Sequence, residues 1–302
     1  MRSHRPFAVA AASVVIALTA VLSPARPPAP AASATPAKTS PGARQVVTVG
    51  HRGASHYAPE NTVAAVDEAA RRRVRWVEND VQRTRDGVLV VLHDATLTRT
   101  TDVEQRYPGR SPWRVGDLTA AEVGRLDAGG WFGRRYRGER VPTLTAYLAA
   151  LERNRQSLLL ELKDPARYPG IERQTLATLR TAGWLDQAHV RRRLVVQSFD
   201  ARALRTVHRL RPAVRTGFLG RPRVRELPQY ARFCDLVNPE QRKADAAYLA
   251  AVHGRRGPHG EPLRSFVWTV DKKNEAVRLA RAGADGVISD VPDVVASALH
   301  RQ

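Results

Sequence analysis

From residue 46 onward, short apolar runs alternate with stretches in which apolar residues recur at helical spacing. Many of the runs are apolar throughout, which is typical of strands that are covered on both faces. The apolar runs predict strands at 46–50, 76–81, 88–92, 157–162, 194–199, 214–219, 234–238, 265–270 and 286–289. The stretches between them predict helices at 59–73, 143–153, 170–183, 201–210, 244–253, 272–282 and 291–300. Repeated strand–helix units in this number predict an α/β fold, a TIM-type (β/α)8 barrel.

Three irregularities qualify this barrel. Nine runs compete for eight strand positions, so one run is either misassigned or peripheral. Only residues 82–87 separate the second run from the third. That leaves no room for a crossover helix, although an extended segment reaching roughly 20 Å permits a parallel pair. The segment 95–140 is rich in Gly, Arg and aromatic residues and poorly periodic, which predicts a small insertion after the third strand, above the active-site face.

The amino-terminal segment has a composition of its own. The first 45 residues contain no Asp or Glu. Arg2 and Arg5 precede an apolar run over 7–22, and a stretch rich in Pro, Ala, Ser and Thr follows. This order is typical of a cleaved secretory signal peptide and a flexible linker. We therefore expect a signal peptide at 1–34, a linker at 35–45, a barrel domain at 46–302 and a secreted protein, with an uncleaved membrane anchor as the alternative.

The chain of 302 residues carries 49 basic and 29 acidic residues, a net charge of +20. Such a charge favours binding of a polyanion such as nucleic acid. However, the 44 Arg and five Lys are scattered along the chain and do not form a cluster, and aromatic residues make up only 6%. We therefore expect no specific nucleic-acid partner and no protein partner. The positive field would instead attract phosphodiesters, anionic membranes or cell-wall polymers. The single cysteine, Cys234, excludes an internal disulfide and a cysteine metal cluster.

Acidic, basic and histidine residues gather where the first four predicted strands end. They are His51 and Arg52 after the first strand, Glu78 and Asp80 in the second, His93 after the third, and Glu161 and Lys163 at the end of the fourth. Catalytic groups of a barrel collect at the carboxyl ends of its strands. Residues two apart in a strand share one face, so Glu78 and Asp80 project together, and Glu161 and Lys163 have the same spacing.

Each of these residues alone has a simpler explanation, such as a surface histidine, an exposed strand pair or a solvated ion pair. Together they favour a catalytic site. Three inward carboxylates repel one another, and one divalent cation, Mg²⁺ or Ca²⁺, relieves that repulsion because hard ions prefer oxygen ligands. Two histidines supply an acid and a base near neutral pH, and Arg52 and Lys163 suit a phosphate. The combination fits metal-assisted cleavage of a phosphodiester.

A series of ordered motifs extends this pattern along the chain. They are His51-Arg52-Gly53, Pro59-Glu60-Asn61-Thr62, Glu78-x-Asp80-Val81, Thr84-x-Asp86-Gly87, Val90-Val91-x-His93-Asp94, Glu161-Leu162-Lys163, Gln197-Ser198-Phe199, Trp268-Thr269-Val270 and the run 283–290. This series resembles the glycerophosphodiester phosphodiesterase family, and the block from His51 to Asp94 is highly specific. Asn79, Asp271 and the pair Arg72-Arg73 depart from the family pattern, which leaves the substrate preference open.

The resemblance implies a phosphatidylinositol-phospholipase-C-like TIM barrel that hydrolyses glycerophosphodiesters to an alcohol and sn-glycerol 3-phosphate. It implies metal ligands at Glu78, Asp80 and Glu161, and an acid/base pair at His51 and His93. It also implies phosphate contacts at Arg52 and Lys163, an orienting role for Glu60, and a pocket wall at Trp268 unless that residue only packs the barrel. Two other functions stay open: a phospholipase D-like enzyme acting on lysophospholipids or sphingomyelin, and a basic polyanion-binding protein.

Overall fold

The computed structural model describes residues 46–300, so the predicted signal peptide and linker lie outside the described residues. Eight parallel strands are paired side by side: β1 (Val47–Gly50), β2 (Trp76–Arg83), β4 (Ser157–Leu162), β5 (Leu194–Ser198), β6 (Arg215–Leu219), β7 (Leu236–Asn238), β8 (Phe266–Val267) and β9 (Gly286–Ser289). Their order is β7-β6-β5-β4-β2-β1-β9-β8. Two parallel bridges, Leu236 with Arg264 and Glu240 with Trp268, bring the ends of this order together. The predicted TIM-type barrel is therefore confirmed.

The third predicted strand does not belong to the barrel. β2 continues past its predicted end to Arg83, and β3 (Leu89–Val91) folds back on it in antiparallel register. Gly87, at φ 85°, takes up the left-handed backbone that this tight turn requires. The parallel pair that the spacing permits is not formed, because the short segment closes a hairpin. The hairpin returns His93 to the level of Asp80, since the Leu92 N–H donates to the Asp80 carbonyl.

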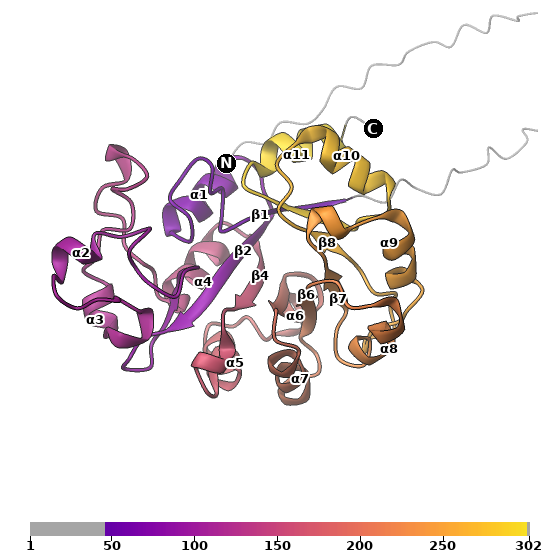
Figure 1. Cartoon of the computed structure of the whole chain (residues 1–302), viewed down its shortest axis with the longest axis horizontal. Helices are drawn as coiled ribbons and strands as arrows, with labels where there is room; N and C mark the ends of the chain where they lie inside the picture. Colours follow the sequence, from indigo (N-terminus) through magenta and orange to yellow (C-terminus); the bar gives the residue numbers. More distant parts are fainter. Residues whose placement is uncertain (1–45, 301–302) are drawn as a thin grey trace, which may run out of the picture. The chain divides into compact units, whose positions relative to one another are not determined.

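Helices surround the strands (Figure 1). They are α1 (Val63–Arg71), α4 (Leu144–Arg153), α5 (Ile171–Thr181), α6 (Gln187–Arg192), α7 (Ala201–Leu210), α8 (Leu227–Tyr230), α9 (Ala246–His253), α10 (Lys273–Arg281) and α11 (Pro292–Leu299), with short 3-10 turns at Pro165–Arg167, Val224–Glu226 and Gln241–Lys243. The helix predicted to begin at Pro59 begins at Val63, because the Thr62 hydroxyl caps it by accepting the Ala65 N–H. Within residues 46–300, no helix has the length and apolarity needed to cross a bilayer.

The inward face of the strands changes from apolar to polar toward their carboxyl ends. Six buried side chains form an apolar layer: Val49, Leu159, Val195, Leu236, Phe266 and Ile288. In β4 the next inward residue after Leu159 is Glu161, and in β5 the next after Val195 is Gln197. The period of two along each strand therefore places polar side chains directly above a closed apolar floor.

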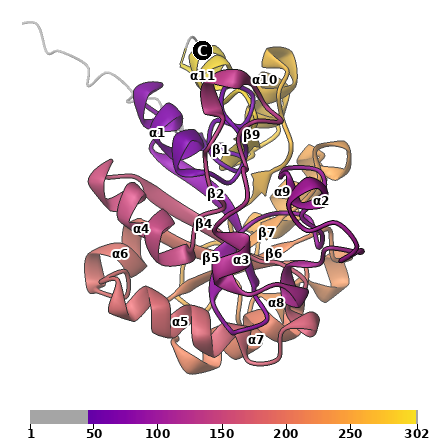
Figure 2. The same cartoon turned by 90° about the vertical axis from the view of Figure 1, so that its left-hand side faces the viewer.

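The segment 95–140 forms a compact insertion with its own apolar cluster. It contains the short helices α2 (Val103–Arg106) and α3 (Ala120–Val123) and 3-10 turns at Val115–Asp117 and Arg134–Tyr136. The Tyr136 hydroxyl donates to the Tyr57 carbonyl at 2.7 Å, and the Ala64 N–H donates to Glu139 at 3.3 Å. These contacts anchor the insertion to the loop after β1 and to the first turn of α1. Figure 2 shows α3 in front of the barrel strands and α2 to the right of it.

Candidate active site

Three buried carboxylates meet inside the barrel where β2 and β4 end. Glu78, Asp80 and Glu161 each offer an oxygen, and these oxygens lie within 4.8 Å of one another. Each of the three residues is 5% exposed or less. Asp80 lies opposite Glu161 in the parallel register of β2 and β4. This register, together with the spacing of two in β2, brings three acidic groups into one small volume.

Burial and mutual repulsion oppose ionisation of this cluster. Burial, followed by the charges of Asp80 and Glu161, raises the pKa of Glu78 well above its ordinary value. Burial and the charge of Asp80 raise the pKa of Glu161 to about 8. Burial also opposes ionisation of Asp80, but Lys163 and Arg52 outweigh it, so the pKa of Asp80 is lowered. A cation placed among these three groups would stabilise their charged forms.

A tight turn after β1 directs Arg52 toward this cluster. Arg52 lies at φ 55°, and its main-chain N–H donates to Glu78 Oε2 at 2.9 Å. Gly53 follows at φ 93°, where an added Cβ would lie 2.5 Å from the Cβ of Ala65. The glycine therefore lets this loop pack against α1. The packed loop holds the backbone of Arg52 in position.

Two cations flank the carboxylates. The Arg52 guanidinium lies 2.8 Å from Glu60 and 3.5 Å from Asp80. Lys163 Nζ lies 3.0 Å from Glu161 and 3.4 Å from Asp80. Burial disfavours both charges, but the neighbouring carboxylates outweigh it and raise the pKa of Arg52 and of Lys163. Both side chains are 16% exposed, so they remain charged and can reach a ligand in the barrel mouth.

Each of the two histidines is held by an aspartate. His51 Nδ1 lies 2.7 Å from Asp290 Oδ1, which also accepts the Ser55 hydroxyl at 2.8 Å. His93 Nδ1 lies 2.6 Å from Asp94 Oδ1. In both rings Nε2 is the nitrogen left for a substrate. Burial is the main cause that lowers the pKa of His93, so its ring is neutral at neutral pH.

Arg99, from the start of the insertion, links the two sides of the site. Its guanidinium donates to both oxygens of Glu60, each at 2.7 Å, and to both oxygens of Asp94, at 2.6 and 2.9 Å. Glu60 binds Arg52, and Asp94 binds His93. The hydrogen bond from Arg99 holds the pKa of Asp94 well below its usual range. One exposed arginine thus orients Arg52 through Glu60 and His93 through Asp94.

These groups surround an inner cavity of about 110 Å³. It is lined by His51, Arg52, Glu78, Asp80, His93, Glu161, Lys163 and Trp268, together with Gln197, Phe199, Leu219, Thr269 and Ile288. Of the predicted site residues, Glu60 alone lies outside its lining, behind Arg52. Trp268 serves both as a wall and in packing, because its ring also contacts the apolar floor and its indole N–H donates to the Asn238 carbonyl at 2.8 Å.

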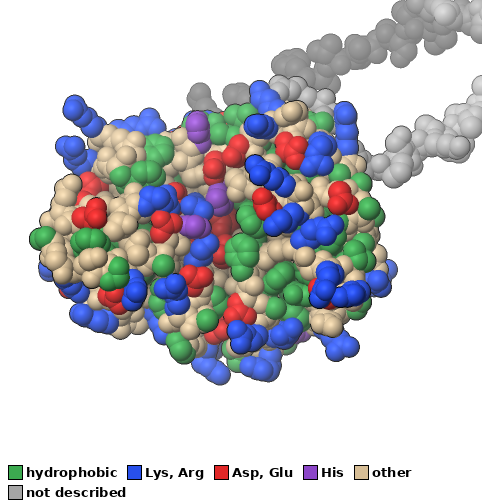
Figure 3. Space-filling model, in the orientation of Figure 1, with side chains coloured by type: hydrophobic (Ala, Val, Ile, Leu, Met, Phe, Trp, Pro, Cys, Tyr) green, Lys and Arg blue, Asp and Glu red, His purple; other side chains and the backbone are tan. Residues whose placement is uncertain are grey.

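Three residues that the sequence analysis leaves without a role support this arrangement: Asp290, Arg99 and Asn61. Asn61 Nδ2 donates to Asp80 Oδ2 at 2.8 Å. Asn61 and Asp290 lie within the motifs quoted above, so the motifs carried a signal for them. Arg99 has none, because its partners lie in two separate loops. In Figure 3, histidine and acidic side chains meet near the middle of the visible face, and Lys and Arg are spread across it without forming one stripe.

Comparison with known proteins decides the family. The model of the Glycerophosphoryl diester phosphodiesterase family matches residues 51–294, which contain every residue of the site. The chain belongs to this family. It is 30% identical over 266 residues to a glycerophosphodiester phosphodiesterase of Caldanaerobacter subterraneus subsp. tengcongensis, covering 85% of this chain and 99% of the relative. It is 30% identical over 269 residues to a Bacillus subtilis glycerophosphodiester phosphodiesterase, covering 83% and 85%.

A solved structure has the same fold as this family member. It is an Oleispira antarctica phosphodiesterase in complex with the product sn-glycerol-3-phosphate, with a TM-score of 0.71 and 28% identity. The alignment covers 84% of this chain and 96% of that one. The predicted family resemblance is therefore confirmed, and the chain is an enzyme of a phosphodiesterase family whose acidic cluster can hold a metal ion.

Proposed function

We propose that this enzyme hydrolyses glycerophosphodiesters to an alcohol and sn-glycerol 3-phosphate, using one divalent cation and two histidines. The observation that carries the proposal is one cavity lined by three buried carboxylates, two cations and two aspartate-held histidines. The relative from Oleispira antarctica that holds sn-glycerol-3-phosphate supports the same product here.

The proposed cation site consists of Glu78, Asp80 and Glu161. All three offer oxygen ligands, which suit Mg²⁺ or Ca²⁺ rather than a softer metal. When bound, the ion supplies positive charge that stabilises the negative charge developing on the phosphoryl oxygens. Lys163 holds two of the ligands in place from the other side, and Arg52 holds the third through its main-chain N–H.

Arg52 and Lys163 bind the phosphate, and the histidines move the protons. His93 is neutral and close to both cations, so we assign it the acceptance of a proton from the nucleophile. His51 then donates a proton to the leaving alkoxide. Because Asp94 and Asp290 occupy the Nδ1 positions, both transfers take place at Nε2. The nucleophile is water or the neighbouring hydroxyl of the substrate glycerol, and ³¹P NMR separates the two by detecting a cyclic phosphate.

The test is choline release from glycerophosphocholine. Activity should be lost in EDTA and return with Mg²⁺ or Ca²⁺. His51→Ala and His93→Ala should each lower turnover at least about a hundredfold, the scale of one acid–base group. His208→Ala, on the outer helix α7, is the matched control and should keep wild-type turnover. Near wild-type rates in both site variants would refute the assignment.

Two further parts of the proposal extend beyond the reaction. Faster hydrolysis of lysophospholipid or sphingomyelin micelles than of soluble diesters would replace the proposed substrate with the phospholipase D-like alternative. Export by a cleaved signal peptide is proposed from the composition of residues 1–45. Intact-mass measurement of the protein recovered outside the cells tests it, because retention of those residues in a cell-bound protein would contradict cleavage.

A further inference from the structure

Two open clefts adjoin the inner cavity, and their chemistry differs. One, of about 670 Å³, shares Glu161, Lys163 and Phe199 with the cavity. The other, of about 390 Å³, shares His51 and Arg52 with it. We call the first the charged cleft and define it by Lys163, Asp164, Arg167, Phe199, Asp200 and Arg202. We call the second the aromatic cleft and define it by Ser55, His56, Trp131 and Phe132.

The inner cavity, of about 110 Å³, is much smaller than either adjoining cleft. The phosphate must lie beside the three carboxylates, where the cations also are. Both clefts share lining residues with this cavity, so a substrate whose phosphate lies there can extend its second arm into either of them.

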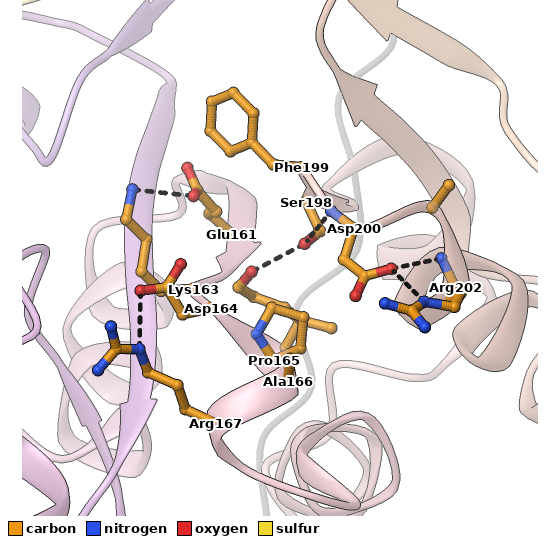
Figure 4. A pocket seen from close by; sticks show the side chains of 12 residues that line it. Glu161, Lys163, Asp164, Pro165, Ala166, Arg167, Ser198, Phe199, Asp200 and Arg202 are labelled. Atoms are coloured by element: carbon orange, nitrogen blue, oxygen red, sulfur yellow. Dashed lines mark hydrogen bonds and ion pairs between the residues drawn. The ribbon is translucent and has the colours of Figure 1, made fainter.

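The charged cleft lies between the chain segments that follow β4 and β5. One wall carries Asp164 and Arg167, 3.4 Å apart, and the other carries Asp200 and Arg202, 3.7 Å apart (Figure 4). The two pairs cancel in charge, so the cleft does not favour an ionic arm. Both pairs still offer exposed donors and acceptors, because Arg167 is 54% and Arg202 is 84% exposed at the side chain.

Phe199 stands between the inner cavity and the charged cleft. It is 52% exposed, and its ring contacts Trp268 edge-on at 5.6 Å between centroids. A flat apolar surface beside paired carboxylates and guanidinium groups suits a polyol, whose C–H face covers the ring while its hydroxyls bond the charged groups. A quaternary ammonium prefers several aromatic faces around it. Among the residues that line this cleft in the described chain, Phe199 is the one aromatic side chain.

We propose that the charged cleft binds the alcohol arm of the substrate and favours an uncharged polyhydroxylated alcohol, such as a cyclitol, over choline. The inference rests on the proposed function and specifies its substrate class. Arg167 and Arg202 are its specificity-determining residues, because they lie outside the inner cavity and touch none of the catalytic groups.

The experiment compares kcat/KM for glycerophosphoinositol and glycerophosphocholine. The wild-type enzyme should favour the inositol substrate. In the double variant Arg167→Ala/Arg202→Ala, kcat/KM for the inositol substrate should fall about tenfold, the effect of one or two lost hydrogen bonds. The choline substrate should lose less than about threefold. Arg173→Ala, an exposed arginine on α5 outside both clefts, is the control and should leave the ratio unchanged.

Trp131→Ala tests the other route. If this variant, and not the double arginine variant, changes the ratio of the two kcat/KM values, the alcohol arm lies in the aromatic cleft and the inference is overturned. An unchanged ratio in both variants overturns it as well. The proposed function fails separately, because in that case the wild-type enzyme hydrolyses neither substrate.

Discussion

Asn79 lies in β2 between Glu78 and Asp80, but its side chain points away from the cavity. It shares the outer face of the strand with Val77 and Val81, which belong to the apolar layer beneath α1 and α4. Asn79 is fully buried, and neither its Oδ1 nor its Nδ2 has a hydrogen-bond partner among the described residues. The amide was desolvated on folding without compensation. Replacing it with leucine should therefore stabilise the protein.

The size of the effect follows from the atoms involved. A buried amide without a partner costs about 1–3 kcal/mol. Leucine has the same branched arrangement of side-chain heavy atoms as asparagine, so Asn79→Leu removes that cost without opening a cavity or overfilling the layer. We expect the free energy of unfolding to rise by about 2 kcal/mol. For a domain of this size, that corresponds to an increase in Tm of about 4–8 °C.

Equilibrium urea unfolding followed by far-UV circular dichroism measures the change. Asn238→Leu is the matched control, because Asn238 is equally buried but donates to Gln197 at 3.1 Å and accepts the Phe266 N–H at 2.9 Å. That variant should lose stability, since it leaves both partners unpaired. If Asn79→Leu were as destabilising as Asn238→Leu, the reasoning that the Asn79 amide is unsatisfied would be refuted.

Four further predictions concern the site and the single thiol. Arg99→Ala should lower kcat/KM about ten- to a hundredfold, whereas Arg106→Ala, at a side chain with the same 44% exposure, should not; equal effects would contradict a positioning role. Asp290→Asn should lower kcat by a similar factor with little change in KM, because the histidine it holds loses its orientation. Glu161→Gln should weaken Ca²⁺ binding, measured by calorimetry, at least about tenfold. Cys234 is buried and its pKa is raised, so it should react with a thiol reagent only after unfolding in guanidinium.

Most of the barrel could be predicted because its strands are buried on both faces and read as apolar runs. The exception is the third run, which looks like the others in composition. The residues of an apolar run do not determine whether it pairs parallel or antiparallel with its neighbour. Gln82 stabilises the antiparallel pairing, because it continues β2 and donates from its buried side chain to the Leu92 and Asp94 carbonyls at 2.7 Å. In the sequence, a polar residue at that position indicates the end of a strand, so the prediction ended the second strand before Gln82.

In the site, too, some residues could be predicted from the sequence and others could not. Its carboxylates could be predicted because a period of two and a parallel register need only local spacing. The contacts of Arg99 and Asp290 depend on how loops far apart in the chain meet. Arg99 reaches Glu60 across 39 positions, and Asp290 reaches His51 across 239. No spacing rule covers such contacts, so only a three-dimensional structure assigns them.

The charge of the inner site explains why so basic a chain holds its reaction centre in acidic residues. Three carboxylates and two cations leave the cavity one charge negative when all are ionised, and a phosphodiester is also negative. Without an ion, the raised pKa values of Glu78 and Glu161 oppose that fully ionised state, whereas a divalent cation would stabilise it. With a divalent ion bound and all three carboxylates ionised, the cavity would carry one positive charge, which one phosphodiester would neutralise. The scattered surface arginines lie outside this balance and act by attraction at long range.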